Sequence, residues 1–164
     1  MKVVFSHGKE SGPWGRKIKV LADIARRKGF VVESIDFTDT LNPDVRVKRL
    51  DDFLKSENCS CVLVGSSMGG YVSTINALNH DVKGLFLMAP ALFMPNYQEQ
   101  KYPVNCKTVV VHGWNDDVIP PSNSIQFAQE AKATLHLIEG DHSLTAVLPE
   151  ISVWFEQFLE AISQ

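Results

Sequence analysis

A serine, an aspartate and a histidine each follow a short apolar segment of this sequence. Ser67 stands in the stretch GSSMGG, Asp116 in HGWNDD and His142 in GDHS. A serine hydroxyl is a poor nucleophile at neutral pH, so it needs a base to take its proton and a carboxylate to orient that base. These three residue types, in the chain order serine, acid, histidine, could therefore carry out acyl transfer.

The glycines around Ser67 decide which of two adjacent serines is the candidate nucleophile. Gly65, Ser67 and Gly69 match G-x-S-x-G, a tight turn between a strand and a helix. Small residues on both sides let strand and helix approach without Cβ clashes, and the helix directs free N–H groups to the same place. The equivalent positions around Ser66 hold larger side chains. By itself, the pentapeptide also fits an ordinary glycine-rich turn.

Apolar and often β-branched runs recur along the chain, with helical patterns between them. The candidate strands are residues 2–5, 30–37, 61–64, 84–90, 107–113 and 134–140. This alternation predicts one α/β domain over residues 1–164, a three-layer α/β/α sandwich with a mostly parallel sheet of about six strands. Functional groups gather at the carboxyl ends of strands in such sheets, so the serine, the acid and the histidine are expected at one edge.

The predicted helices each have one apolar face. The first has apolar residues at helical spacing, namely Ile18, Leu21, Ile24 and Ala25, and the last has an apolar stripe over residues 151–162. The outer face of the first helix carries five basic residues, which we interpret as a solvated surface: Arg16, Lys17, Lys19, Arg26 and Arg27.

Composition limits the possible partners and the compartment. The 164 residues carry a formal charge of -3 with a pI near 5.9, which argues against a nucleic-acid surface. No apolar run approaches the ~20 residues needed to cross a bilayer, and the N-terminal MKVVFSHG is typical of a strand and not of a signal peptide. Three cysteines without a repeated spacing predict free thiols and a cytoplasmic location.

Four segments together carry a resemblance to a known family. SHGKESG, GSSMGGY, HGWNDDVIP and GDHSL resemble the α/β-hydrolase superfamily and occur in that family's order. The resemblance implies that Ser67 is the nucleophile, His142 the general base and acid, and Asp116 the orienting carboxylate. It also implies an oxyanion hole made by the main-chain N–H groups of Lys9 and Met68. The expected fold is a minimal version that lacks two N-terminal strands and a cap.

Residues 91–106 occupy the place where many relatives insert a lid. The segment is too short for a helical cap and long enough for an apolar lip, although a surface loop packed onto the core fits it as well. The candidate substrate-lining residues are Trp14, Phe93, Met94 and Trp114. An open site with apolar walls suits small or short-chain acyl groups.

The remaining motifs predict no cofactor and no metal. No cluster of His, Cys and carboxylates has metal-ligand spacing, and no nucleotide-binding glycine motif occurs. His7 and His112 each precede a glycine at a strand end, where we expect them to shape the loop.

We therefore predict a serine hydrolase that cleaves a small or short-chain carboxylic ester or thioester. A peptidase or amidase would use the same triad, and a catalytically silent binding protein could keep the same fold. The expected partner is a small-molecule ester, with no nucleic acid and no membrane, and the sequence leaves the oligomeric state open.

Overall fold

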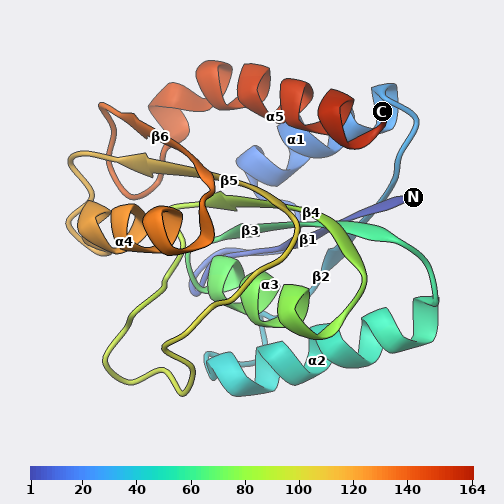
Figure 1. The fold of residues 1–164 in the computed structure, drawn as a ribbon, viewed down its shortest axis with the longest axis horizontal. Helices are drawn as coiled ribbons and strands as arrows, with labels where there is room; N and C mark the ends of the chain where they lie inside the picture. Colours follow the sequence, from blue (N-terminus) through green and yellow to red (C-terminus); the bar gives the residue numbers. More distant parts are fainter.

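The computed structural model describes residues 1–164 and contains one six-stranded sheet (Figure 1). The strands are β1 (Lys2–Ser6), β2 (Val31–Ile35), β3 (Cys61–Ser66), β4 (Val82–Met88), β5 (Lys107–Gly113) and β6 (Thr134–Ile138). Their order across the sheet is β2-β1-β3-β4-β5-β6, and every neighbouring pair is parallel. The sheet is thus wholly parallel, where the sequence analysis expected a mostly parallel one.

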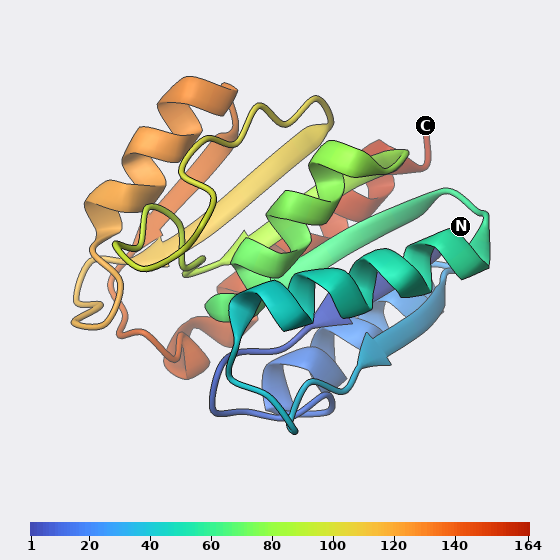
Figure 2. The same cartoon turned by 90° about the horizontal axis from the view of Figure 1, so that it is seen from below.

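Five α-helices cover the two faces of the sheet. They are α1 (Arg16–Arg27), α2 (Pro43–Glu57), α3 (Met68–Asn79), α4 (Pro121–Ala131) and α5 (Leu148–Ile162), the last preceded by a 3₁₀ turn over Thr145–Val147. Helices α1 and α5 pack together on one face, while α2, α3 and α4 lie on the other (Figures 1 and 2). This arrangement confirms the three-layer fold, with no cap present.

Two apolar cores fill the spaces between the sheet and its helices. Val3 and Phe5 contribute to the core under α1 and α5, whereas Val4 contributes to the core under α2 and α3. Successive side chains of a strand point to opposite faces, so buried strands must be apolar throughout. The apolar face predicted for α1 is buried in the first of these cores.

Residues 89–106, between β4 and β5, form no helix and pack onto the second core. The buried Tyr102 lies with its ring centroid 5.1 Å from that of Phe93 and 6.1 Å from that of Phe127. Its hydroxyl donates to the carbonyl of Glu99 at 2.8 Å and accepts from the N–H of Phe93 at 3.0 Å. The Tyr102 hydroxyl is therefore satisfied both as a donor and as an acceptor, and its ring anchors this segment to the core.

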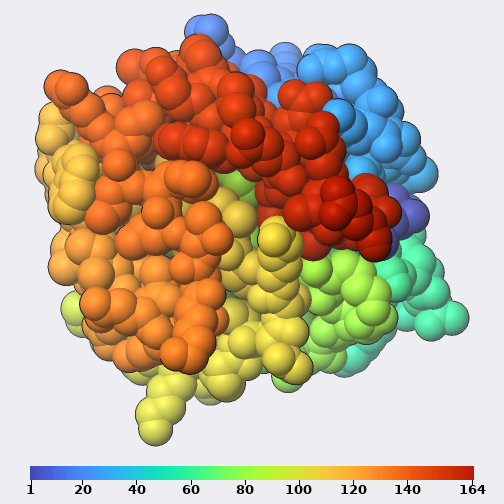
Figure 3. Space-filling model, turned by 45° about the horizontal axis from the view of Figure 1, so that its top comes forward, coloured from blue at the N-terminus to red at the C-terminus, as the bar shows by residue number.

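The carboxyl ends of the strands and the chain termini lie at opposite edges of the sheet. The residues Ser6, Ser66, Gly113 and Ile138 end four parallel strands, so they share one edge. The two termini both lie at the other edge (Figures 1 and 2). In the space-filling view, the C-terminal third of the chain forms a continuous surface beside the N-terminal residues (Figure 3). None of the helices has the length and apolar composition that a membrane span requires.

Candidate active site

Ser67 occupies the turn between β3 and α3 in a strained backbone conformation. Its φ is 54° and its ψ is -120°, a combination that is costly for any residue with a Cβ. A Cβ added at Gly65 would lie 2.3 Å from the carbonyl oxygen of Gly69, and one added at Gly69 would lie 2.0 Å from that of Ser6. The glycines are therefore required by the close approach of β1, β3 and α3, and this approach holds the turn in place.

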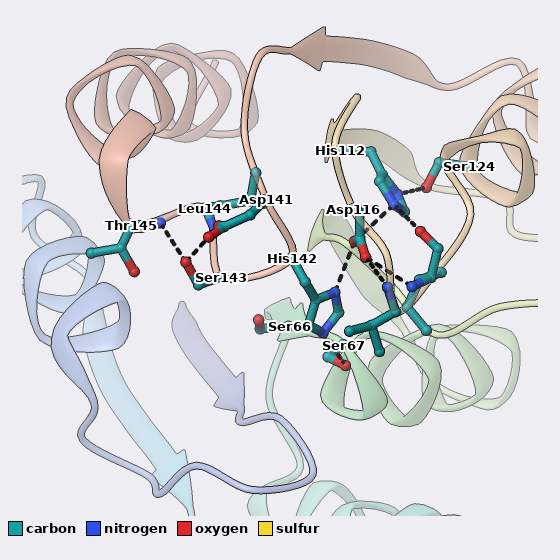
Figure 4. A network of polar contacts seen from close by, with 12 residues as sticks. Ser66, Ser67, His112, Asp116, Ser124, Asp141, His142, Ser143, Leu144 and Thr145 are labelled. Atoms are coloured by element: carbon teal, nitrogen blue, oxygen red, sulfur yellow. Dashed lines mark hydrogen bonds and ion pairs between the residues drawn. The ribbon is translucent and has the colours of Figure 1, made fainter.

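A chain of hydrogen bonds joins the three predicted catalytic side chains (Figure 4). Ser67 Oγ lies 3.0 Å from Nε2 of His142, and Nδ1 of His142 lies 2.8 Å from Oδ2 of Asp116. A carboxylate only accepts, so Nδ1 carries the imidazole proton. Nε2 is then the acceptor for the hydroxyl proton of Ser67. The structure thus brings together residues from the ends of β3, β5 and β6.

Both oxygens of the Asp116 carboxylate have donors. Oδ1 accepts from the N–H groups of Val118 and Ile119, each at 2.8 Å. Oδ2 accepts from His142 and lies 3.1 Å from Nε2 of the buried His112. The neighbouring Asp117 is exposed and makes no side-chain hydrogen bond. The geometry therefore selects Asp116 as the partner of the imidazole.

The buried imidazole of His112 contacts the Asp116 carboxylate. Its Nε2 donates to the carbonyl of Ile119 at 2.9 Å as well as to the carboxylate, so its Nδ1 accepts from the hydroxyl of Ser124 at 2.6 Å. Burial lowers the pKa of the His112 imidazole, which favours its neutral form. Sequence reasoning had expected His112 to shape its loop only. The direct bond to Asp116 was not foreseen, because it depends on the turn that follows β5.

The loop after β1 lies beside Ser67 and offers a free N–H group. A Cβ added at Gly8 would lie 3.6 Å from the Cβ of Ser67. The carbonyl of Gly8 accepts from Nη1 of Arg46 at 3.0 Å, and that of Lys9 accepts from Nη2 at 3.1 Å. In a planar trans peptide the C=O and the following N–H point in opposite directions, so the Lys9 N–H points away from Arg46.

That N–H makes no hydrogen bond within the protein. Met68 is the first residue of α3, where the N–H group has no partner inside the helix. The main-chain N–H groups of Lys9 and Met68 thus lie near Ser67, and neither donates a hydrogen bond to another part of the protein. Sequence reasoning missed Arg46, which is fully buried in the structure.

A cavity of about 700 Å³ opens over Ser67. Its walls come from the β1–α1 loop, the first turn of α1, the turn at Ser67, residues 94–97 and the loop around His142. Met94 lines it as predicted, together with Tyr97. Most of the accessible wall surface is apolar, although only seven of the 23 lining residues are hydrophobic and the lining includes charged side chains.

Three of the four residues predicted to line the site lie elsewhere. The ring of Trp14 lies 5.5 Å from the guanidinium of Arg26 on the outside of α1, where a cation–π contact holds it. Phe93 packs against Tyr102 in the core, and Trp114 is 55% exposed outside the cavity. These predictions were wrong because position after a strand places a residue near the edge but does not set its side-chain direction.

Lys17 also differs from its predicted role on a solvated helix face. It is half-buried and lines the cavity, where its Nζ donates to the carbonyl of Ser143 at 2.7 Å and to the Oγ of Ser66 at 3.2 Å. It lies in the first turn of α1, which stands at the edge of the sheet where the strands end, so its side chain reaches the candidate site. No group of three or more His, Cys, Asp or Glu side chains is placed to hold a metal ion.

Comparisons with known proteins place this geometry in a family. Residues 2–103 match the model of the Uncharacterised protein family (UPF0227), a range that includes Lys9, Arg46 and Ser67. A solved structure from Xanthomonas campestris pv. campestris, described as a candidate hydrolase of the alpha/beta superfamily, is 31% identical with a TM-score of 0.90, and the match covers 98% of each chain.

Two more distant solved structures share the fold. Alpha/beta hydrolase domain-containing protein 10 from mouse is 16% identical with a TM-score of 0.82, and the match covers 98% of this chain and 90% of that one. Est1E from Butyrivibrio proteoclasticus is also 16% identical with a TM-score of 0.82, over 99% of this chain and 88% of that one. No curated protein sequence matches the chain. On this sequence and structural similarity, the chain belongs to the UPF0227 family and, with it, to the α/β-hydrolase superfamily.

Proposed function

We propose that the protein is a serine hydrolase that cleaves small or short-chain carboxylic esters or thioesters. The observation that carries the proposal is the continuous hydrogen-bond chain from Ser67 through His142 to Asp116, with contacts of 3.0 and 2.8 Å. The strained turn at Ser67 supports it, because such strain holds a nucleophile clear of the sheet.

In the proposed first step, Ser67 Oγ attacks the carbonyl carbon of the ester. Its proton passes to Nε2 of His142, and Asp116 stabilises the imidazolium through Nδ1–H. The oxygen of the tetrahedral intermediate then takes hydrogen bonds from the N–H groups of Lys9 and Met68. Each such donor is typically worth roughly 3 kcal/mol to the transition state. As the carbon–oxygen or carbon–sulfur bond breaks, Nε2–H returns its proton to the leaving alcohol or thiol.

In the second step, water hydrolyses the acyl-enzyme. His142 Nε2 takes a proton from water, the hydroxide attacks the acyl carbon, and Ser67 Oγ leaves with the proton that Nε2 returns. The product acid then dissociates through the open mouth of the cavity. We place this activity in the cytoplasm, where reducing conditions suit the free thiols of Cys59, Cys61 and Cys106.

A fluorophosphonate probe tests the nucleophile directly. The wild type should be labelled on Ser67, and Ser67→Ala should lose both labelling and the acylation burst with p-nitrophenyl butyrate. Ser66→Ala is the matched control, because it removes the adjacent hydroxyl and leaves the strained turn intact, and it should keep labelling. Labelling that survives in Ser67→Ala and disappears in Ser66→Ala would contradict the assignment.

The same variants separate the alternative functions. A catalytically silent binding protein would show no labelling in the wild type and no difference in ester turnover between wild type and Ser67→Ala. A peptidase or amidase would be labelled and would also hydrolyse p-nitroanilides and unactivated amides that carry the same acyl groups. We expect labelling together with turnover of the esters and no measurable turnover of the matched amides.

A further inference from the structure

The cavity over Ser67 has an excess of positive charge in its lining. Lys9, Arg16 and Lys17 line it, whereas Glu10 is the one acidic residue that does so. None of these four side chains takes part in an ion pair within the protein. The net charge of these lining side chains is therefore positive, and no direct ion pair neutralises it, although the carboxylates of Asp141 and Asp116 lie close enough to act on Lys17.

Among the cations that line the cavity, Lys17 makes hydrogen bonds to residues adjacent in the chain to Ser67 and His142. Its Nζ donates to the Oγ of Ser66 and to the carbonyl of Ser143, and these two residues are the chain neighbours of Ser67 and His142. An ammonium has three N–H donors, so one is free for a ligand. Both oxygens that accept from Nζ are neutral. Burial lowers the pKa of the Lys17 ammonium, while the negative charges of Asp141 and Asp116 act in the opposite direction and raise it.

A half-buried ammonium without an anionic partner is destabilising to the folded protein. Holding Ser66 and Ser143 together requires only a hydrogen-bond donor, which a neutral side chain can provide. A positive charge at this point adds something different, namely attraction for a negatively charged group that enters the cavity. Such a group would complete the coordination of Nζ and offset the cost of burying the charge.

We propose that Lys17 binds an anionic oxygen group of the substrate, a carboxylate or a phosphate, so that the enzyme selects esters or thioesters that carry a negative charge. The inference rests on the proposed function and extends it from a reaction to a substrate class. Lys17 is in this view a specificity-determining residue, and it is distinct from the groups that carry out bond cleavage.

The test compares probes that differ in one charge. Mono-4-nitrophenyl adipate carries a carboxylate at the end of its acyl chain, and its methyl ester is the neutral match. Hexanoyl esters of 4-hydroxybenzoate and of methyl 4-hydroxybenzoate place the same difference on the leaving group. The charge of the natural substrate lies either on its acyl group or on its leaving group. In the probe pair that matches this position, we expect the anionic probe to have the higher kcat/KM after subtraction of spontaneous hydrolysis.

Variants at position 17 connect this preference to the ammonium. Lys17→Met should lower the ratio of kcat/KM for anionic over neutral probe by about tenfold, which corresponds to 1.4 kcal/mol. Lys17→Arg should keep much of the ratio because it keeps the charge. Lys19→Met is the matched control, since Lys19 is exposed on the same helix and outside the cavity, and its ratio should equal that of the wild type. Competitive inhibition by hexanoate and by hexyl phosphate then distinguishes a carboxylate from a phosphate as the preferred anion.

Two results would overturn the inference while leaving the hydrolase intact. The first is a wild type that treats charged and neutral probes alike on both arms. The second is a Lys17→Met variant that keeps the wild-type ratio, either with unchanged rates or with both rates lowered equally, as loss of a purely structural tie would. If the wild type hydrolyses no probe, the proposed function fails and calorimetry decides the inference. Monomethyl adipate should then bind more tightly than dimethyl adipate, and Lys17→Met should abolish the difference; equal binding would refute the anion site.

Discussion

The carboxylate of Asp116 is held by two main-chain N–H groups and two imidazoles, whereas the adjacent Asp117 points to solvent without a partner. The two adjacent aspartates thus have different surroundings. Replacing each of them in turn by asparagine compares their contributions to kcat.

Asp116→Asn should therefore reduce kcat for p-nitrophenyl butyrate strongly, because an amide no longer holds the proton of His142 on Nδ1. The equivalent change in a comparable triad lowers kcat ~10⁴-fold. Steady-state kinetics measure the loss, and circular dichroism establishes that the variant is folded. Asp117→Asn should keep near-normal turnover. Normal kcat in folded Asp116→Asn would rule out its role as the orienting group.

A second residue that affects the candidate site is Arg46, which acts through the main chain of the loop after β1. Its buried guanidinium donates to the carbonyls of Thr40, Gly8 and Lys9, at 2.9, 3.0 and 3.1 Å, and forms no ion pair. These bonds set the direction in which the Lys9 N–H points. Arg46 is in this sense a positioning residue for the proposed oxyanion hole.

Replacing Arg46 by methionine should lower kcat by about 10–100-fold while KM changes little, because a misdirected oxyanion donor loses part of the 10²–10³-fold that one donor typically supplies. Arg46→Lys should restore part of kcat by donating to one carbonyl. Arg49→Met, on the same helix and exposed to solvent in part, is the control and should leave kcat unchanged. A folded Arg46→Met with wild-type kcat would refute this role.

At the scale of elements, the segment between β4 and β5 sets the size of the site. The core contacts of Tyr102 hold this segment down, while Met94 and Tyr97 form part of the cavity wall. Sequence reasoning left two possibilities for residues 91–106, an apolar lip or a loop packed on the core. Different residues of the segment do each of these.

Short acyl chains should accordingly be preferred. A long alkyl chain gains ~0.8 kcal/mol per methylene only where it enters apolar surroundings, and the charged side chains of Lys9, Arg16 and Lys17 interrupt the apolar surface of the cavity wall. We expect kcat/KM for acetyl to hexanoyl p-nitrophenyl esters to exceed that for the palmitoyl ester. The measurement is an ester series below the critical micelle concentration of each substrate. A steady rise of kcat/KM up to palmitoyl would reveal an apolar path for the chain.

The elements themselves could be predicted well from the sequence. The six apolar runs and the helical patterns of the first and last helices appear in the structure because each is a local periodic signal, and Gly65 and Gly69 mark the turn at Ser67 by steric necessity. The directions of Trp14 and Lys17 could not be predicted. They depend on where the first turn of α1 stands relative to the sheet edge, which is a consequence of three-dimensional packing.

For the molecule as a whole, two buried imidazoles make stability depend on pH. Burial lowers the pKa of His7 and of His112 below the value of an exposed histidine. The unfolded chain therefore binds more protons than the folded one as pH falls below about 6.5. Stability is complete above that pH and decreases on acidification, until the pH reaches the lowered pKa of the folded state.

Urea unfolding at pH 7.5 and pH 5.5 should show this decrease. Each buried histidine contributes a slope of up to ~1.4 kcal/mol per pH unit in this window. His112→Asn should have a lower free energy of unfolding at pH 7.5 but a smaller pH slope, because one titrating group is gone. An exposed-site variant, Lys19→Met, should keep the wild-type slope. An unchanged slope in His112→Asn would mean that His112 is protonated equally in the folded and unfolded states.

Both chain termini lie at the edge of the sheet opposite the carboxyl ends of the strands (Figures 1 and 2). A linker fixed to a bead or an electrode through either terminus would therefore leave the mouth of the cavity facing the solution. An immobilised sample should admit substrate as freely as the dissolved protein does, whichever end carries the linker. The loops that build the site, by contrast, contain no free end through which the protein could be tethered.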